Sequence, residues 1–503
     1  MTDQQLAPGD GAPSFFAALA ASLRTAGDRM VLTEAGRSLT GNELSSEIDR
    51  WAAALSALGV RPGDRVAAQA EKSLALALVY LATLRLGAVF LPLNPAYRAD
   101  EVAYFLDDAE PRLLVADPGA VPARAGLTIM TLDAGGGGTL ADAVARADNP
   151  APPPHAASPD DLAVIVYTSG TTGRAKGAMI THRNLLVNAR ALIATWGIGA
   201  DDVLLHALPL FHIHGLFIAL NTLLLAGGRI DLLPGFDAAT VVDRLPGATL
   251  FMGVPTYYTR LLAAPAFDRA TANSIRLFVC GSAPLTPATF AAFEARTGQR
   301  ILERYGMSEC GIICSNPLDG DRVAGAVGRP LPGYQVRIAD AAPVGVLEVR
   351  GDSVFAGYWR QPDKTRAEFR DDGFFVTGDI ATIDATGVVR IVGRDKDMII
   401  SGGLNVYPKE IEERIDAIDG VVESAVVGVP HADFGEAVVA VVHAVPDAAL
   451  SADAILARLR PVLAAFKLPK AVFLVDALPR NTMGKVERNV LRARYDALWA
   501  GDA

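Results

Sequence analysis

Apolar residues along the chain follow two patterns that alternate. A helical pattern from Asn42 to Leu58 is followed by a short strand-like run from Arg65 to Ala70. The same order returns with a helical pattern from Leu74 to Leu86 and a strand-like run from Ala88 to Leu91. Continuous apolar strands that alternate with helices are typical of parallel sheets covered on both faces. The pattern therefore predicts an α/β fold for most of the chain.

The pattern changes near Gly393, where glycine and charged residues interrupt it. Beyond this point two strand-like runs, Ser424 to Val429 and Ala437 to His443, lie among two helical patterns, Lys409 to Ala417 and Ala452 to Ala464. Such a mixture is enough for a small α+β unit with its own core. The glycine and the charges at this seam are typical of a linker that bends.

The length of the chain supports a division into domains. At 503 residues it exceeds the size at which a single hydrophobic core stops growing. We predict a large N-terminal region over residues 1–393, built from α/β subdomains with mainly parallel sheets, and a small mobile α+β domain over residues 394–503. A glycine- and proline-rich stretch from Ala134 to Pro154 predicts a loop or a subdomain boundary.

Composition and charge exclude several classes of partner. A formal net charge of −10 argues against binding nucleic acid through phosphate neutralisation. The longest apolar stretch, Leu74 to Leu93, is interrupted by Arg85, so we expect a buried helix and strand there and no membrane span. Three cysteines without a CxxC pair predict reduced thiols in a cytoplasmic protein. The sequence does not indicate an oligomeric state.

A loop rich in glycine and hydroxyl residues follows a further predicted strand, Asp161 to Tyr167. Its glycines let backbone amides approach phosphate oxygens, and its hydroxyls and lysine add donors. It lacks the Gly-Lys-Ser/Thr ending of a Walker A motif, and its composition alone would fit a flexible surface loop equally well. The candidate phosphate ligands are Thr168, Ser169, Gly170, Thr171, Thr172, Gly173 and Lys176.

Further motifs follow this loop in a fixed order. They are LPLFHIHG (208–215), CGSAP (280–284), LERYGMSE (302–309), VTGD (376–379), VGR (392–394) and PRNTMGK (479–485). Together with the YTSGTTGRAKG loop (167–177), these motifs resemble those of the adenylate-forming acyl-CoA synthetases, a family that includes luciferases and the adenylation domains of peptide synthetases. The resemblance extends over nearly the whole chain. It implies that ATP and coenzyme A are co-substrates and that Mg²⁺ accompanies the ATP.

The resemblance places the ATP site in five of these motifs. The loop would bind the β- and γ-phosphates, and Glu309 would hold a Mg²⁺ that bridges them, since this ion usually combines one carboxylate with substrate phosphates. Ser308 stands where the family usually has threonine and keeps the hydroxyl, and Tyr305 would stack on the adenine. The remaining implied ATP contacts are Gly281, Ser282, Ala283, Glu303, Arg304, Gly306, Met307, Ser308, Asp379 and Arg394.

The ribose contact depends on Asp379 and Arg394. Residues 374–376 predict a strand, and Thr377, Gly378 and Asp379 a turn after it, where a carboxylate could accept both ribose hydroxyls. The residues alone would allow Asp379 to be a simple turn cap. The resemblance favours the ribose role and places Arg394 beside it.

The acid site and the catalytic groups are also implied by the resemblance. A histidine in an apolar run is usually a satisfied core residue, but the resemblance places His212 beside the acid and the thiol, with Ser282, Gly306 and Met307, and leaves His214 structural. Lys485 would bridge the attacking carboxylate and the α-phosphate and stabilise the negative charge of the transition state. Without the resemblance, Lys485, Glu303 and Glu309 would be ordinary surface charges.

The C-terminal segment carries the parts that would move. The resemblance makes Lys396 the hinge between two conformations. Ser401, Gly402 and Gly403 would line the tunnel for the pantetheine arm of coenzyme A.

The segment GVPTYYTR (253–260) bears on the identity of the acid, because it ends in Arg260. A guanidinium matches a carboxylate bidentately, and this segment with its neighbours resembles malonyl-CoA synthetases. Arg260 would then hold the distal carboxylate of malonate as a buried group, the alternative being a structural ion pair. A less polar stretch, Cys310 to Cys314, departs from the malonyl group and leaves methylmalonate open as a substrate.

The predicted reaction converts malonate, ATP and coenzyme A into malonyl-CoA, AMP and pyrophosphate through a malonyl-adenylate. Lys485 would be inserted for the first half-reaction and withdrawn by rotation about Lys396 for the second. Three alternatives stay open: a ligase for another short acid, an enzyme that loads a carrier protein, and a catalytically silent nucleotide-binding protein.

Overall fold

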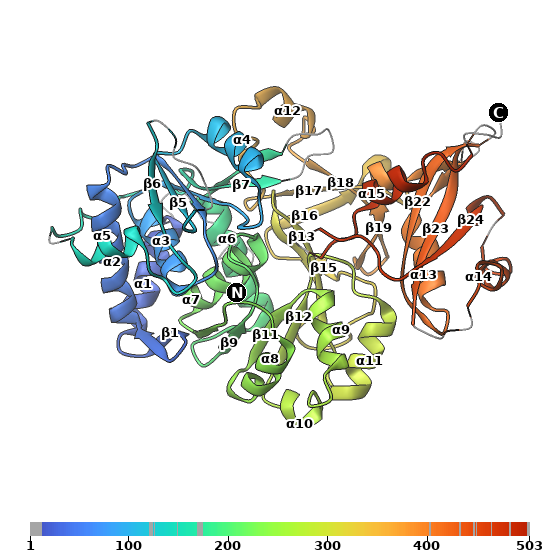
Figure 1. The fold of residues 1–503 in the computed structure, drawn as a ribbon, viewed down its shortest axis with the longest axis horizontal. Coiled ribbons are helices and arrows are strands. Elements are labelled where there is room, and N and C mark those ends of the chain that lie inside the picture. The colour runs from blue at the N-terminus through green and yellow to red at the C-terminus, as the bar shows by residue number, and fades with distance from the viewer. Residues whose placement is uncertain are drawn as a thin grey trace.

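The computed structural model describes residues 13–119, 124, 126–147, 149–168, 175–401, 404–431, 434–445, 448, 450–463, 465–481 and 484–499. Four sheets organise this part of the chain. Three of them belong to the larger body in Figure 1, and the fourth lies at the C-terminal side of the molecule, coloured orange to red. The α/β class predicted from the sequence is confirmed.

A six-stranded sheet has the order β6-β5-β3-β4-β7-β8 and is parallel except for its last pair. Its strands are β3 (Arg65–Gln69), β4 (Val89–Pro92), β5 (Leu113–Ala116), β6 (Thr128–Thr131), β7 (Leu162–Thr168) and β8 (Lys176–Thr181). The strands β4 and β5 are buried along their whole length, and for β4 this is what the continuous apolar run predicted. β7 and β8 form a hairpin around the phosphate loop.

A nine-stranded sheet has the order β15-β14-β13-β12-β11-β9-β10-β1-β2. It is parallel from β13 to β1 and antiparallel at both edges. The strands are β1 (Met30–Glu34), β2 (Arg37–Thr40), β9 (Val203–His206), β10 (Arg229–Leu232), β11 (Leu250–Gly253), β12 (Leu277–Cys280), β13 (Leu302–Met307), β14 (Gly311–Ser315) and β15 (Arg329–Pro330). The carboxyl ends of β12 and β13 therefore lie side by side, where open α/β sheets place ligands.

A four-stranded antiparallel sheet follows, with β16 (Tyr334–Ile338), β17 (Gly345–Gly351), β18 (Phe375–Ile383) and β19 (Val389–Arg394). The predicted turn at Thr377, Gly378 and Asp379 is wrong, because these residues belong to β18. Gly378 has a φ of +70°, and the register shifts after Ile380, so the turn-like residues serve an irregular strand instead of ending it.

The C-terminal sheet contains β20 (Ile399–Ser401), β21 (Leu404–Val406), β22 (Val421–His431), β23 (Gly435–Ala444) and β24 (Ala471–Val475). Its two faces carry separate apolar clusters, one around Ile411 and Ile455 and one around Leu478 and Leu491. Both clusters are distinct from the cores of the preceding sheets. This sheet, with the helices beside it, buries its own apolar residues.

Helices cover the sheets, and their ends follow from local sequence. Thr40 and Glu43 form a reciprocal capping box at the start of α2, which buries Leu44, Ile48 and Trp51 on one face. The long helices are α1 (Phe15–Ala26), α2 (Gly41–Ala57), α3 (Leu74–Arg85), α4 (Ala99–Ala109), α6 (His182–Trp196), α9 (Pro255–Ala263), α11 (Pro287–Thr297) and α13 (Pro408–Asp416).

The shorter helices include one that the sequence did not indicate. α5 (Thr139–Ala145) lies inside the stretch predicted as a loop, and α14 (Ala452–Leu459) ends earlier than predicted. The others are η2 (His214–Asn221), α7 (Thr222–Ala226), α8 (Ala238–Arg244), η3 (Leu245–Gly247), α10 (Arg269–Ala272), η4 (Ala339–Ala341), α12 (Pro362–Ala367), η5 (Asp395–Asp397), η6 (Ala465–Lys467) and α15 (Arg488–Tyr495). Within the described residues, every helix falls short of the length and apolarity needed to cross a membrane.

Candidate active site

The first group of site residues flanks the loop between β7 and β8; we call it the Glu309 cluster (Thr168, Lys176, Glu309, Tyr358 and Glu368). Thr168 ends β7 and donates its hydroxyl to Glu309 Oε1 at 3.2 Å. Tyr358 Oη lies 3.3 Å from the same oxygen and 2.7 Å from Glu368 Oε2. Lys176, at the start of β8, donates to Glu368 Oε1 at 3.0 Å. Every charged member therefore has a partner within the chain.

The loop itself lies outside the described residues, and with it the predicted ligands Ser169, Gly170, Thr171, Thr172 and Gly173. Thr168 and Lys176, which lie on either side of it, are register partners in the hairpin. Glu309 is buried, and this burial raises the pKa of its carboxyl. The plain expectation that Glu309 is a surface charge is wrong.

The second group is the Asp379 cluster (Tyr305, Asp379 and Arg394). Tyr305 Oη donates to Asp379 Oδ2 at 2.6 Å, and Arg394 Nε lies 3.0 Å from Asp379 Oδ1. Asp379 and Arg394 are register partners on β18 and β19, so the sheet holds them side by side. Asp379 is buried, whereas Arg394 is exposed. Tyr305, predicted to contact adenine, is thus hydrogen-bonded to Asp379, which pairs with Arg394; both of these were predicted to contact the ribose.

The third group is the Arg304 cluster (His212, His214, Gly281, Ser282 and Arg304), at the ends of β12 and β13. A Cβ at Gly281 would lie 2.4 Å from the guanidinium carbon of Arg304, so any larger residue there would force that side chain to move. Ser282 has a φ of +71°, an uncommon conformation for a residue with a β-carbon, and its Oγ lies 3.2 Å from His214 Nδ1. The amide of His214 in turn donates to His212 Nδ1 at 3.3 Å.

Polar atoms in the Arg304 cluster lack partners. Arg304 Nε and Nη2 and His214 Nε2 are buried and have no hydrogen-bond partner among the described residues. Desolvation lowers the pKa of Arg304 to about 10, which leaves it charged at neutral pH. Burial, with the nearby positive charges of Lys485 and Arg304, lowers the pKa of His212 to about 3, so its imidazole is neutral.

Glu303 is buried as well, against the plain expectation of a surface charge. Its Oε1 accepts from the amide of Leu285 at 3.3 Å, and its Oε2 has no partner among the described residues. Desolvation raises its pKa to about 7, and the charge of Lys409 from α13 opposes this shift. Side chains alternate along β13, so Glu303 and Arg304 extend from opposite faces of the strand.

Arg260 is less buried than the sequence suggested. It occupies the last turn of α9 and is exposed, so the expectation of a buried guanidinium is wrong. No ion pair of Arg260 occurs in the described part of the chain. The buried guanidinium of the site is that of Arg304. The remaining predicted residues, Ala283, Gly306, Met307 and Ser308, are half-buried at or just beyond the ends of β12 and β13.

Lys485 extends from the C-terminal segment toward all three groups. By surface area its side chain is exposed, yet many protein atoms surround its ammonium, and they lower its pKa to about 8. Desolvation is the largest cause, and the positive charges of Arg394 and Arg304 add to it while Asp379 and Glu309 oppose it. Its hairpin is closed by a hydrogen bond from its own amide to Asn481 Oδ1 at 3.0 Å. The lysine is thus within electrostatic reach of every cluster.

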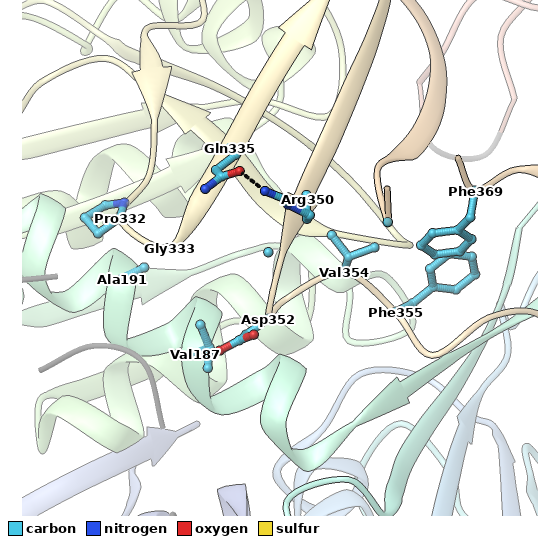
Figure 2. A pocket seen from close by; sticks show the side chains of 12 residues that line it. Val187, Ala191, Pro332, Gly333, Gln335, Arg350, Asp352, Val354, Phe355 and Phe369 are labelled. Carbon is cyan, nitrogen blue, oxygen red and sulfur yellow. Dashed lines mark hydrogen bonds between the residues drawn. The ribbon is translucent and has the colours of Figure 1, made fainter. Parts of the chain in front are cut away.

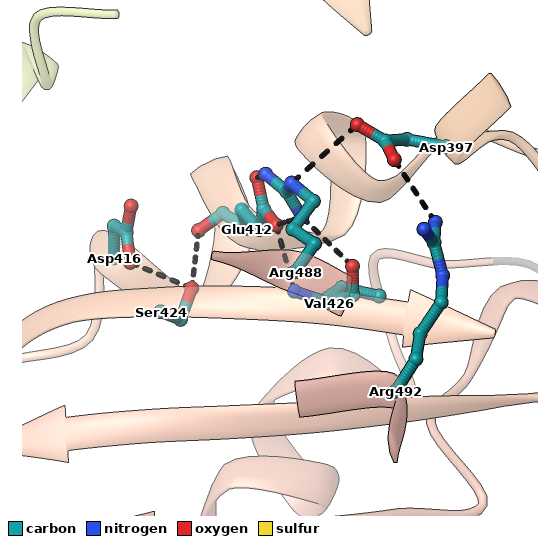
Figure 3. Close-up of polar contacts among 7 residues, drawn as sticks. All are labelled: Asp397, Glu412, Asp416, Ser424, Val426, Arg488 and Arg492. Atoms are coloured by element: carbon teal, nitrogen blue, oxygen red, sulfur yellow. Dashed lines mark hydrogen bonds and ion pairs between the residues drawn. The ribbon is translucent and has the colours of Figure 1, made fainter. Parts of the chain in front are cut away.

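The hinge candidate Lys396 is exposed in η5, and its neighbour Asp397 connects this segment to α15 (Figure 3). Asp397 Oδ1 pairs with Arg492 at 3.0 Å and Oδ2 lies 3.9 Å from Arg488, which also makes a bidentate pair with Glu412. Arg488 is the first residue of α15 and follows Lys485 by three positions. Of the predicted coenzyme A contacts, Ser401 is buried at the end of β20, whereas Gly402 and Gly403 lie outside the described residues.

Sequence reasoning missed Glu368 and Tyr358. Glu368 lies 192 residues from Lys176 along the chain, and no local pattern predicts that contact. It also missed a buried pair behind the Arg304 cluster, in which Lys72 Nζ lies 3.1 Å from His206 Nδ1 and donates to its carbonyl at 2.7 Å. His206 in turn contacts the carbonyl of Gly215 at 2.9 Å, which fixes the end of the LPLFHIHG segment.

Two family models match the chain: that of the AMP-binding enzymes over residues 19–359 and that of their C-terminal domain over residues 410–485. The chain belongs to the AMP-binding enzyme family. It is an acid–thiol ligase, an adenylate-forming acyl-CoA ligase that uses ATP and coenzyme A as co-substrates.

Similar proteins act on different acids. ATP-bound MatB from Rhodopseudomonas palustris is 50% identical, with a TM-score of 0.92 over 96% of this chain and 99% of that one; apo MatB gives 0.83. Feruloyl-CoA synthase from an Amycolatopsis species is 37% identical over 92% of this chain and 94% of its own length. The mitochondrial malonate–CoA ligase of Mus musculus is 35% identical over 86% and 82%. The arrangement of this chain is thus nearer to the ATP-bound form of MatB than to its apo form.

Proposed function

We propose that this enzyme is a malonate–CoA ligase, which converts malonate, ATP and coenzyme A into malonyl-CoA, AMP and pyrophosphate. One observation carries the choice of acid: the unpartnered, buried guanidinium of Arg304 beside Gly281 and His214. A buried cation without a partner is costly, and a carboxylate of the substrate would remove that cost. The likeness to MatB and to malonate–CoA ligases supports the same choice.

In this proposal the two carboxylates of malonate have different partners. The distal carboxylate binds Arg304, whose planar fork suits bidentate recognition. Arg260, the residue first expected in this role, is exposed, so it enters the proposal only as a second arginine to be tested. The reacting carboxylate then faces the α-phosphate of ATP beside Lys485.

The first half-reaction is carried by charges that are already in place. A carboxylate oxygen of malonate attacks the α-phosphorus, and the bond to the leaving pyrophosphate breaks. Lys485 stabilises the negative charge that gathers in this transition state. Asp379, Arg394 and Tyr305 would hold the ribose and adenine, and Lys176 with Thr168 the outer phosphates. The products are malonyl-adenylate and pyrophosphate.

A Mg²⁺ bound with the ATP fits the residues present at Glu309. The two side-chain hydroxyls beside this carboxylate, those of Thr168 and Tyr358, both lie against Oε1, so Oε2 receives no side-chain donor from the described residues. One free carboxylate oxygen plus phosphate oxygens is the usual protein contribution to a Mg²⁺ site. When bound there, the ion would neutralise phosphate charge during the transfer.

The second half-reaction requires a different face of the C-terminal segment. We propose that residues 394–503 rotate about Lys396 relative to residues 1–393, which withdraws Lys485 and presents Ser401 with Gly402 and Gly403 to the pantetheine arm. The thiol of coenzyme A then attacks the carbonyl carbon of the adenylate, and AMP leaves. His212 is neutral at working pH, so it adds no charge beside the entering thiol.

Methylmalonate is a second candidate acid. The segment Cys310 to Cys314, predicted to be unusually apolar, is largely buried in the main core directly after Glu309. An apolar surrounding at this end of the site is compatible with an added C2-methyl group.

The test is a panel of malonate, methylmalonate, succinate, acetate and ferulate, assayed for AMP release with the wild type, Arg304→Met and Arg260→Ala. We expect malonate to be the preferred acid, Arg304→Met to lose about 100-fold on malonate, and Arg260→Ala to lose much less. Preference for acetate or ferulate, unchanged by Arg304→Met, would remove the diacid proposal. Loss with Arg260→Ala alone would return the anchor role to that residue.

A further inference from the structure

Glu368 receives three hydrogen-bond donors, although nothing in the proposed reaction uses it. Its Oε1 accepts from Lys176 Nζ at 3.0 Å and lies 2.9 Å from Lys364 Nζ, and its Oε2 accepts from Tyr358 Oη at 2.7 Å. These bonds lower the pKa of its carboxyl against the opposing effect of burial, so Glu368 is an anion at neutral pH. The carboxylate is therefore held in one place by donors from three directions.

Lys176 depends on this carboxylate. Its side chain is only 8% exposed, and its ammonium lies 4.8 Å from the centre of the Tyr358 ring. An ammonium buried to this extent needs a countercharge, and in the described residues Glu368 is the carboxylate that pairs with it. Since an ammonium has three donors, Lys176 keeps capacity for phosphate oxygens while it remains paired.

Tyr358 connects Glu368 to the carboxylate proposed for Mg²⁺. Its single hydroxyl proton lies between Glu368 Oε2 at 2.7 Å and Glu309 Oε1 at 3.3 Å. The shorter distance assigns that proton to Glu368. Glu309 therefore keeps most of its capacity as an oxygen ligand, even though a tyrosine hydroxyl is close to it.

An aromatic wall fixes this network from behind. Phe355 packs edge-on against Tyr358, with ring centres 4.8 Å apart, and stacks with Phe369, the residue after Glu368. The amide of Phe355 also donates to the carbonyl of Glu309 at 2.7 Å. Figure 2 shows the two rings together at one end of a cavity of about 460 Å³. The backbone of Glu309, the Tyr358 ring and the residue after Glu368 are therefore all packed on or bonded to Phe355.

We propose that Glu368 is a positioning residue for ATP: it holds the Lys176 ammonium at the edge of the phosphate loop and takes the Tyr358 proton away from Glu309. This inference rests on the proposed contact between Lys176 and the outer phosphates, and it does not depend on which acid is used. The alternative arrangement, in which Glu368 competes with ATP for Lys176, predicts the opposite change in affinity when its charge is removed.

The experiment compares two nucleotides by isothermal titration calorimetry on the full chain. Mg²⁺ with the β,γ-imido analogue AMP-PNP, added without any acid so that no adenylate can form, presents β- and γ-phosphates, whereas AMP does not. We expect Glu368→Gln to weaken AMP-PNP binding about tenfold and AMP binding less than twofold. Lys364→Met is the matched control, since it removes a donor to the same oxygen from a more exposed position, and it should change neither affinity by more than twofold.

Coupling to Lys176 is tested by a double-mutant cycle. If Glu368 acts through Lys176, the loss of AMP-PNP affinity in Lys176→Met/Glu368→Gln should equal that of Lys176→Met alone. Tighter AMP-PNP binding by Glu368→Gln would overturn the proposal and show that Glu368 competes with ATP for Lys176. An equal loss of affinity for AMP-PNP and AMP would also overturn it, because Glu368 would then have only a structural role. Nucleotide binding needs no acid, so a failed malonate assay leaves this result interpretable.

Discussion

In the Glu309 cluster, the ammonium of Lys176 and the carboxylates of Glu309 and Glu368 all have partners from the chain itself. In the Arg304 cluster, buried nitrogens of Arg304 and His214 have none among the described residues. The first arrangement organises charges before a ligand arrives. The second leaves a cost that a ligand would remove. The difference suggests that the nucleotide site is held in place by contacts within the chain, whereas the acid site selects its substrate by supplying the partner that the chain lacks.

The largest expected effect concerns Lys485, which lies between the two clusters. Lys485→Ala should lower pyrophosphate exchange by about 10²- to 10³-fold, because a positioned charge on the transition state is lost. Conversion of supplied malonyl-adenylate to the thioester should continue. Equal loss of both half-reactions would show that the lysine supports the folded structure of the site, and would contradict a role limited to the first step.

The difference between the Arg304 cluster and the Glu309 cluster predicts that removing a charge from each will change the stability of the protein in opposite directions. Arg304→Met should raise the free energy of unfolding of the free protein by about 1–3 kcal/mol, because it replaces an unpartnered buried cation with an apolar side chain. Lys176→Met should lower it by about 1 kcal/mol, because Glu368 loses a partner. Urea unfolding without ligands measures both. A fall in both variants would mean that the Arg304 nitrogens are satisfied in solution, and the contrast between the clusters would be lost.

A smaller effect follows from the pKa of Lys485, which is lowered to about 8. Its ammonium form decreases as the pH rises through 8, so pyrophosphate exchange should fall about tenfold for each pH unit above that value. AMP affinity measured over the same range is the control, because it needs no charge on Lys485. A rate that stays level to pH 9.5 would contradict the charge role.

The smallest expected effect concerns Asp397, which ties the hinge segment to the helix after Lys485. Asp397→Asn should slow pyrophosphate exchange about fivefold, since the pair with Arg492 is only partly buried and is worth about 1 kcal/mol. Glu413→Gln, which alters a longer surface pair with Lys409, is the matched control. An unchanged rate in Asp397→Asn would show that Lys485 is placed by its hairpin alone.

Local patterns in the sequence predicted much of the scaffold. The helix α2 and the buried strand β7 follow from the periodicity of apolar residues, which depends on near neighbours. The predicted turn at Asp379 failed because turn-forming residues also serve irregular strands. A single sequence gives no measure of such a tertiary effect.

The site was predictable only where a motif carried it. Lys485, Glu309 and Asp379 were found by resemblance, and the structure brings them together. Arg260 and Arg304 have the same side chain, and only the packing of β12 against β13 shows which of them is buried. Glu368 was missed because its importance arises from contacts with residues far away in the chain.

The missing β-carbon at Gly281 has a consequence for how this enzyme could change its substrate. Because even one methyl group there would overlap the Arg304 guanidinium, positions 281 and 304 form a coupled pair that tolerates few single steps. Replacement of Gly281 alone would displace the arginine, whereas replacement of Arg304 first would open space for a larger residue at 281. A lineage that turns from diacids to bulkier acids is therefore expected to lose the arginine before it loses the glycine.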